Sequence, residues 1–130
     1  MAITRILAAV VAAVFMLTAG PANAELKKGW LEYTHGSKKL KGYVVHDDAI
    51  AGKRPAVLVI HAREGMTPKT LALTEMWAKL GYVAFAADIF GYGEGILPNG
   101  DQEMSAQTSV FRKDRALART RTQAGWDVLV

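Results

Sequence analysis

The residues best suited to chemistry follow an apolar segment. Ala56–Ile60 (AVLVI) runs directly into His61, Arg63 and Glu64. Imidazole and carboxylate groups are the usual proton-transfer groups of enzymes, and active-site residues often lie in a loop that a rigid strand positions. The alternative is structural: His61 caps the strand end by hydrogen bonding to the backbone. Arg63 and Glu64 would then form an exposed ion pair worth under about 1 kcal/mol.

Three other places contain residue types that are common at functional sites. We expect Asp88, near the end of a second apolar run, to fix the loop that follows rather than to act as a base. The GYGEG motif at 91–95 lacks the G-x-G-x-x-G spacing of a dinucleotide site, and no helix starts directly on it. The HDD motif at 46–48 consists of adjacent residues, which rarely converge on one ion. We therefore expect no metal site and no cofactor.

The elements around these residues predict an α/β fold. Residues 25–46 have the pattern of a β-hairpin that turns at His35-Gly36-Ser37. Ala56–Ile60 has no polar alternation, which indicates a strand buried on both faces. Tyr82–Phe90 is a further apolar run, and the helix expected between the two predicts a right-handed unit with parallel strands.

Two helical regions are expected. Thr67 as N-cap and Pro68 at the first helical position begin one helix, and Gly81 ends it. The apolar residues between them predict its inner face; they are Leu71, Leu73, Met76, Trp77 and Leu80. After the loop at 91–100, residues 101–130 form helix in two pieces, broken near Lys113-Asp114. Their predicted inner face comprises Leu117, Ala124, Val128 and Leu129.

Residues 1–24 have the anatomy of a secretory signal peptide. Arg5 precedes the apolar run Ile6–Leu17, and Ala22-Asn23-Ala24 forms a small-x-small cleavage site. The run is too short for the ~20 residues that span a bilayer. We therefore expect a periplasmic or secreted protein with its domain at 25–130, and no membrane association after cleavage.

Composition excludes several classes of site and partner. The chain has no cysteine, which removes disulfides, thiolate metal sites and a cysteine nucleophile within its 130 residues. The net charge is only +4, and the basic residues are scattered. The basic residues of Arg112–Arg121 alternate with apolar ones at helical spacing, which indicates a solvated helix face. Nucleic-acid binding would require a denser basic patch, so we do not expect it.

Several motifs in order resemble the dienelactone hydrolase family. YTHGSKKLKGYVVHDD resembles its opening hairpin, KRPAVLVIHAREG its third strand and following loop, AKLGYVAFAADIFGYG its fourth strand and turn, and AGWDVLV the helix before its nucleophile strand. The resemblance covers nearly all of residues 25–130. It implies a three-layer α/β-hydrolase fold, of which this chain would be the N-terminal half, with a mainly parallel sheet. It also implies hydrolysis of small-molecule esters or lactones by a Cys-His-Asp triad.

The resemblance also implies which parts of a site are present. The family's nucleophile elbow, G-x-C/S-x-G, follows the next strand and would lie after Val130, and the acid and histidine come later still. Ser37, Ser105 and Ser109 have no such context, and His35, His46 and His61 precede the place of the family's histidine. We therefore expect an incomplete hydrolase chain that is inactive as given.

The resemblance assigns candidate roles to five residues. The backbone N–H of Arg63 matches the family's oxyanion-hole donor. His61, Ala62, Glu64 and Tyr92 are candidates for contacting substrate. The family usually has a glutamate at the position of Ala62, and some members have an arginine at that of Tyr92. The first departure argues against assigning the family's nucleophile-control role to this chain. The second argues against assigning it an anionic substrate.

The chain also has an alternative function and an expected physical property. The alternative is a secreted, non-catalytic α/β module that binds a ligand or partner through loops 61–66 and 91–100. The implied strand order, 1-2-4-3, leaves Ala56–Ile60 as an unpaired apolar edge, which predicts aggregation of the chain alone.

Overall fold

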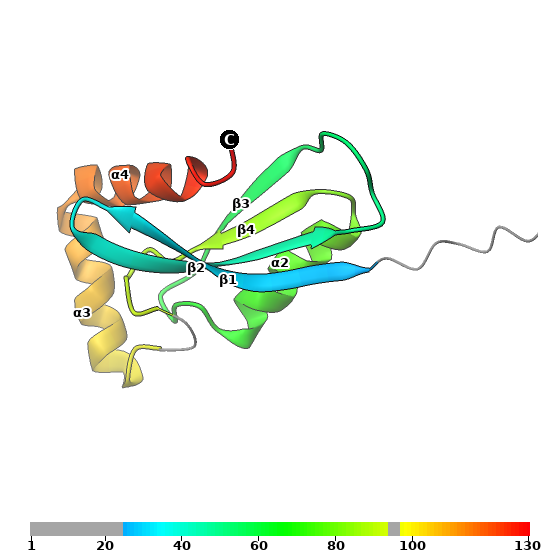
Figure 1. The fold of residues 1–130 in the computed structure, drawn as a ribbon. Helices are drawn as coiled ribbons and strands as arrows, with labels where there is room; N and C mark the ends of the chain where they lie inside the picture. The colour runs from blue at the N-terminus through cyan, green and yellow to red at the C-terminus, as the bar shows by residue number, and fades with distance from the viewer. Residues whose placement is uncertain (1–24, 94–96) are drawn as a thin grey trace, which may run out of the picture.

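The computed structural model describes residues 25–93 and 97–130, and within them one sheet is flanked by helices (Figure 1). The predicted signal peptide lies outside the described residues. The elements in chain order are β1 (Leu26–His35), β2 (Lys38–Asp47), β3 (Ala56–Ile60), α2 (Pro68–Lys79), β4 (Val83–Ala87), α3 (Gly100–Lys113) and α4 (Arg115–Trp126).

The sheet has the strand order β1-β2-β4-β3, as predicted. Gly36 and Ser37 connect β1 and β2, and Gly36 has a φ of 58°, which glycine adopts without a steric cost. The expectation of a mainly parallel sheet is wrong. β1–β2 and β2–β4 are antiparallel, and only β3–β4 is parallel. The reason is that the hairpin supplies half of the strands, whereas a single strand–helix–strand unit supplies one parallel pair.

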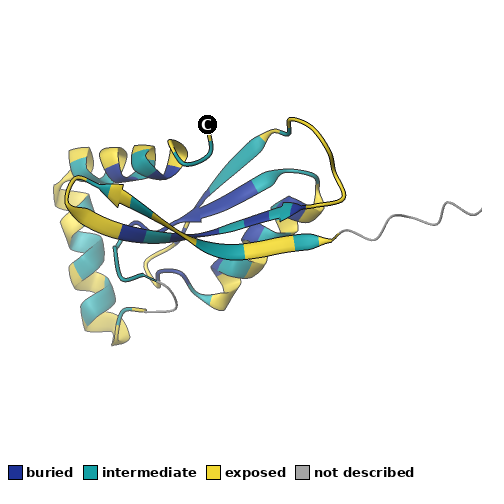
Figure 2. Ribbon diagram, viewed as in Figure 1, coloured by how far each residue is buried: buried dark blue, intermediate teal, exposed yellow. Residues whose placement is uncertain are grey.

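Helices cover both faces of the sheet, so the predicted three layers are present (Figure 1). Successive residues of β4 point to opposite faces. Ala84 and Ala86 pack in the cluster that includes Ala78 of α2, whereas Phe85 and Ala87 pack in the cluster that Phe111 of α3 contacts. These four of the five β4 residues are fully buried. Figure 2 shows these buried residues in dark blue along β4, together with the buried residues of β2.

Strand β3 is less buried than its sequence predicts. Only Val59 is buried, and Ile60 is 46% exposed. Among the described residues, β3 pairs with β4 alone, so its other edge has no hydrogen-bonding partner strand. Its apolar composition would suit an interior strand, but its position at the edge leaves part of it uncovered.

Helix α2 begins and ends as predicted, but a different face packs on the sheet. The Thr67 side chain accepts a hydrogen bond from the Thr70 N–H, Pro68 is the first helical residue, and Gly81 has a φ of 95°. The buried positions are the small residues Thr70, Thr74 and Ala78. Leu71 and Trp77 are partly buried, whereas the remaining predicted inner residues are exposed; they are Leu73, Met76 and Leu80. Small side chains at i, i+4 and i+8 allow the helix to approach the alanine-rich face of the sheet closely.

Asp114 separates α3 from α4, where the break was predicted. It ends α3, and its side chain accepts a hydrogen bond from the Leu117 N–H at 2.8 Å, which caps α4. Val128 and Leu129 pack against the core as expected. The buried residues of α4 itself are Arg121 and Gly125. In the described part of the chain, no helix is both long and apolar enough to cross a bilayer.

Candidate functional site

The parallel pair β3–β4 brings two polar segments to the same edge of the sheet. Ile60 and Ala87 are partners in the register. His61 and Asp88 therefore leave the sheet side by side, and the two strand-end loops start from adjacent positions. This is where ligand sites form in α/β sheets.

His61 links the ends of the two strands. Its Nδ1–H donates to the Ala62 carbonyl at 2.8 Å, and its Nε2 accepts from the Ile89 N–H at 3.1 Å. His61 is 9% exposed, and its ring lies edge-on to Phe90. Burial lowers the pKa of His61, opposed by the bond to Ala62 and by the nearby Asp88 carboxylate. Both ring nitrogens are bound to backbone groups, so the predicted hydrogen bonding of His61 to the backbone is confirmed, and its contact with substrate stays a prediction.

A tight turn follows His61 and leaves backbone donors free. The Gly65 N–H donates to the Ala62 carbonyl at 3.0 Å, which places Arg63 and Glu64 at the centre of a four-residue turn. The same carbonyl accepts from His61, so two bonds hold it. Among the described residues, no hydrogen bond uses the N–H of Arg63 or Glu64. The turn thus presents two N–H groups that have no partner in the described part of the chain, beside the end of β3.

The Arg63 side chain pairs with α3 and not with its neighbour. Its Nη2 lies 2.7 Å from Oδ1 of Asp101. The predicted Arg63–Glu64 ion pair is therefore wrong, because the turn directs Arg63 toward the first turn of α3. Both side chains of the observed pair are well exposed to solvent, so the pair contributes little to stability.

Asp88 organises the glycine loop, as predicted. Its carboxylate accepts hydrogen bonds from the N–H groups of Gly91 at 2.7 Å, Gly93 at 3.1 Å and Lys41 at 3.4 Å. Both glycines have positive φ, which turns successive N–H groups toward one anion. That anion is the protein's own carboxylate. The loop therefore uses internally the donors that a nucleotide-binding loop would offer to phosphate.

Tyr92 is held against α3. Its hydroxyl donates to Oε1 of Glu103 at 2.6 Å, and the other oxygen of Glu103 accepts from the Asn99 N–H. Desolvation and the Glu103 carboxylate raise the pKa of Tyr92 to about 12. Tyr92 is a neutral hydroxyl at neutral pH, whereas an arginine at this position would offer a charged anchor.

Two adjoining cavities lie between the turn and α3. One, of about 260 Å³, is largely aromatic and apolar; its lining residues are His61, Ala62, Arg63, Ile89, Phe90, Thr108, Phe111 and Arg112. The other, of about 230 Å³, is polar; it is lined by Arg63, Ser105, Thr108, Ser109 and Arg112. A third cavity, of about 530 Å³, lies on the α2 side of the turn and is lined in part by Glu64. The turn therefore separates a cavity on the α3 side from one on the α2 side.

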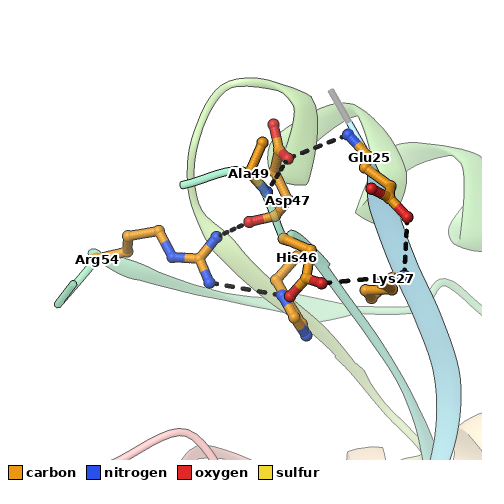
Figure 3. Close-up of polar contacts among 7 residues, drawn as sticks. Glu25, Lys27, His46, Asp47, Ala49 and Arg54 are labelled. Atoms are coloured by element: carbon orange, nitrogen blue, oxygen red, sulfur yellow. Dashed lines mark hydrogen bonds and ion pairs between the residues drawn. The ribbon is translucent and has the colours of Figure 1, made fainter. Parts of the chain in front are cut away.

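The HDD motif at 46–48 serves the end of the hairpin (Figure 3). Asp47 Oδ1 accepts from the N–H groups of Glu25 and Ala49, and His46 Nδ1 faces the Arg54 guanidinium at 3.5 Å. Among the described residues, no group of three or more potential ligand side chains is arranged to hold a metal ion.

Arg121 is a buried cation of α4. It was expected on a solvated helix face, but it is 9% exposed. Its Nη1 donates to the Ile89 carbonyl at 2.9 Å, and its guanidinium lies over the Phe111 ring at 5.4 Å. Its Nε has no hydrogen-bond partner among the described residues. Residues 117, 121, 124 and 128 have helical spacing, which places Arg121 on the inner face. This spacing was the sequence signal that could have predicted its burial.

Comparison with known proteins identifies this architecture. The model of the dienelactone hydrolase family matches residues 40–127. A putative hydrolase fragment, YghX from Escherichia coli (strain K12), is 33% identical over 76 residues, which are 58% of this chain and 65% of that protein.

Two solved structures are also similar to this chain. One, m3DLH, is 28% identical with a TM-score of 0.72, over 78% of this chain and 42% of that chain. The other is the dienelactone hydrolase-like promiscuous phosphotriesterase P91 from metagenomic libraries. It is 28% identical with a TM-score of 0.73, over 81% of this chain and 42% of that chain. The chain has the dienelactone hydrolase-like α/β-hydrolase fold and spans less than half the length of these two structures.

Proposed function

The chain belongs to the dienelactone hydrolase family, and from this premise we propose that it forms the oxyanion-binding side of an ester or lactone hydrolase site. The observation that carries the proposal is the turn Ala62–Gly65. It presents the Arg63 N–H without an internal acceptor among the described residues, beside a cavity that could hold a substrate. A backbone donor held in this way stabilises the charge that develops on the substrate oxygen, typically by about 3 kcal/mol.

The remaining chemistry would come from residues that this chain does not supply. It contains no cysteine. His61 has both ring nitrogens bound to the backbone, and the Asp88 carboxylate is filled by three N–H groups, so neither is available to activate a nucleophile. We therefore propose that the nucleophile, the acid and the catalytic histidine belong to a longer protein, in the part of the fold that follows α4.

The substrate would be a small ester or lactone. The cavity beside Arg63 contains Phe90 and Phe111, which suit an apolar acyl or ring group. Ala62 offers no carboxylate to control a nucleophile, and Tyr92 is bound to Glu103, so neither reproduces the family's most specific contacts. These differences favour a substrate without the anionic group that an arginine at position 92 would bind.

The first test reads the coding sequence beyond the Val130 codon. If the proposal is right, that coding sequence continues in frame with a strand followed by G-x-C/S-x-G. The proposal also expects the 130-residue chain to hydrolyse p-nitrophenyl acetate no faster than buffer. A natural stop codon, together with a stable and inactive product, would favour the alternative of a binding module that uses loops 61–66 and 91–100.

The second test removes the backbone donor in the extended protein. Arg63→Pro deletes the N–H at a turn position that proline tolerates, and kcat should fall about 10²-fold to 10³-fold. Arg63→Gln keeps the N–H and should retain most of kcat. An equal loss in both variants would show that the side chain, and not the N–H, is what matters.

We also propose that the protein is exported to the periplasm or secreted, with cleavage after Ala24. The support is the sequence of residues 1–24 alone. N-terminal sequencing of the protein from its native host should begin at Glu25. A mature protein that still begins at Met1 would contradict the proposal.

A further inference from the structure

We propose that the polar groove between the turn 62–65 and α3 is a phosphate-binding site. This proposal does not depend on the hydrolase function. The groove is the cavity of about 230 Å³, and its lining combines two guanidiniums with three hydroxyls; the residues are Arg63, Ser105, Thr108, Ser109 and Arg112. No carboxylate is among these lining residues.

The helix spacing accounts for this arrangement. Positions 105, 108, 109 and 112 stand at i, i+3, i+4 and i+7, so they form one stripe on α3. Arg63 reaches the same stripe from the turn, because its bond to Asp101 ties it to the first turn of α3. The groove therefore combines donors from the turn and from α3, and the pair that links the two segments, Arg63 and Asp101, is 38 residues apart in sequence.

Most of these donors have no other use in the described part of the protein. No hydrogen bond or ion pair with another described residue involves the side chains of Ser105, Ser109 or Arg112. Thr108 is different, because its hydroxyl donates to the Met104 carbonyl at 2.7 Å. The groove thus offers the Arg112 fork, the remaining Arg63 N–H groups and two free hydroxyls.

This donor set suits a phosphate better than a carboxylate. One guanidinium can satisfy both oxygens of a carboxylate with a bidentate pair. Two guanidiniums and two hydroxyls exceed that need, but they match a group with three or four acceptor oxygens, and arginine is favoured where phosphate is recognised. Asp101 competes for Arg63, yet its side chain is 89% exposed and remains hydrated.

The surroundings add positive charge and room for an organic group. Arg121 lies over Phe111, whose ring lines the adjoining cavity together with Phe90. Thr108, Arg112 and Arg63 line both cavities. A phosphomonoester could therefore place its phosphate in the polar groove and its apolar group beside the aromatic rings.

The test is calorimetric titration of the purified chain with inorganic phosphate at constant ionic strength. Arg112→Gln should weaken binding by about 10-fold or more, because it removes a charged fork of N–H donors from the groove. Ser105→Ala combined with Ser109→Ala should also weaken it. Arg115→Gln is the matched control, since it removes the same charge from a neighbouring exposed position outside the groove. The affinity of this variant for phosphate should stay within about 2-fold of that of the unchanged protein.

Two further ligands decide the class and the source of the anion. Acetate should bind more weakly than phosphate; equal binding would overturn the assignment to phosphate. Phenyl phosphate that binds more tightly than inorganic phosphate would identify an organic phosphomonoester, whereas equal affinity would identify the free ion. Absence of phosphate binding, or equal losses in Arg112→Gln and Arg115→Gln, would overturn the site itself.

Discussion

At the scale of single residues, the two strand-end loops are held by Asp88 and His61. Both are of residue types common in catalysis, but both form hydrogen bonds with the protein's own backbone. Asp88 binds backbone N–H groups of the glycine loop and of β2, and His61 ties the end of β3 to the Ile89 N–H. Each is buried and occupied. Their role is to hold the loops in place, so that the free donors of the turn 62–65 stay fixed.

Replacing Asp88 should show this role through stability. Asp88→Asn removes the charge and replaces one acceptor oxygen by an NH2 group, which cannot accept from the backbone N–H groups. The free energy of unfolding should therefore fall by about 2 kcal/mol. Urea denaturation at pH 7 measures this change. The control is Asp48→Asn, because Asp48 is exposed and its Oδ2 makes only a long contact, of 3.9 Å, with Nζ of Lys27. This variant should change the free energy of unfolding by less than about 0.5 kcal/mol. Equal effects would rule out the organising role of Asp88.

The buried His61 also predicts a dependence of stability on pH. Its folded-state pKa is lowered below the ordinary value of 6.5, so the unfolded chain binds the proton more readily. The contribution of neutral His61 is present above pH 6.5 and is lost as the pH falls toward its folded-state pKa. Denaturation curves between pH 7 and pH 5 should show this loss, and His61→Asn should have a flatter profile. The same slope in both proteins would contradict the prediction.

At the scale of elements, close packing depends on residues without large side chains. Thr70, Thr74 and Ala78 let α2 approach one face of the sheet, and Gly125 lets α4 approach the other. A Cβ at Gly125 would lie 2.8 Å from the Ala87 Cβ. These small residues therefore let both helices lie close to the sheet.

Gly42 in β2 provides the sharpest test of this packing. A Cβ there would overlap Cζ of Phe85 and lie 2.7 Å from the Ala86 carbonyl oxygen. Gly42→Ala should therefore lower the free energy of unfolding by about 1–3 kcal/mol. Gly29→Ala in β1 is the control, because no atom lies within 4 Å of its added Cβ. If Gly42→Ala is no less stable than Gly29→Ala in urea titrations, the packing argument fails.

At the scale of the whole molecule, the sheet ends on an apolar edge. β3 has no second partner strand among the described residues, and it carries no charge. Cavities of about 550 and 530 Å³ flank this edge, one toward α4 and one toward α2. Such an edge can pair with another copy of the chain.

This edge predicts concentration-dependent self-association of the chain, measurable by light scattering. Ile60→Lys places a charge on the 46% exposed end of β3 and should reduce the association. Ile50→Lys is the control, because Ile50 is a comparably exposed isoleucine outside the strands. If both variants reduce scattering equally, general surface polarity rather than the edge is responsible.

The helices, the strands and their order along the chain could be predicted from the sequence. Local signals were sufficient there: Thr67-Pro68 begins a helix, Gly36-Ser37 turns a hairpin, and Asp114 separates two helices, because each acts through neighbouring backbone groups. The order of short motifs also indicated the family.

Which side chains are buried, and which groups contact one another across the fold, depended on the tertiary structure. Pairing at the edge exposed Ile60, and the approach of α4 buried Arg121. The contact between turn and helix joined Arg63 to Asp101 and created the polar groove on α3. These outcomes depend on distances between segments far apart in the chain, and no local pattern of residues contains those distances.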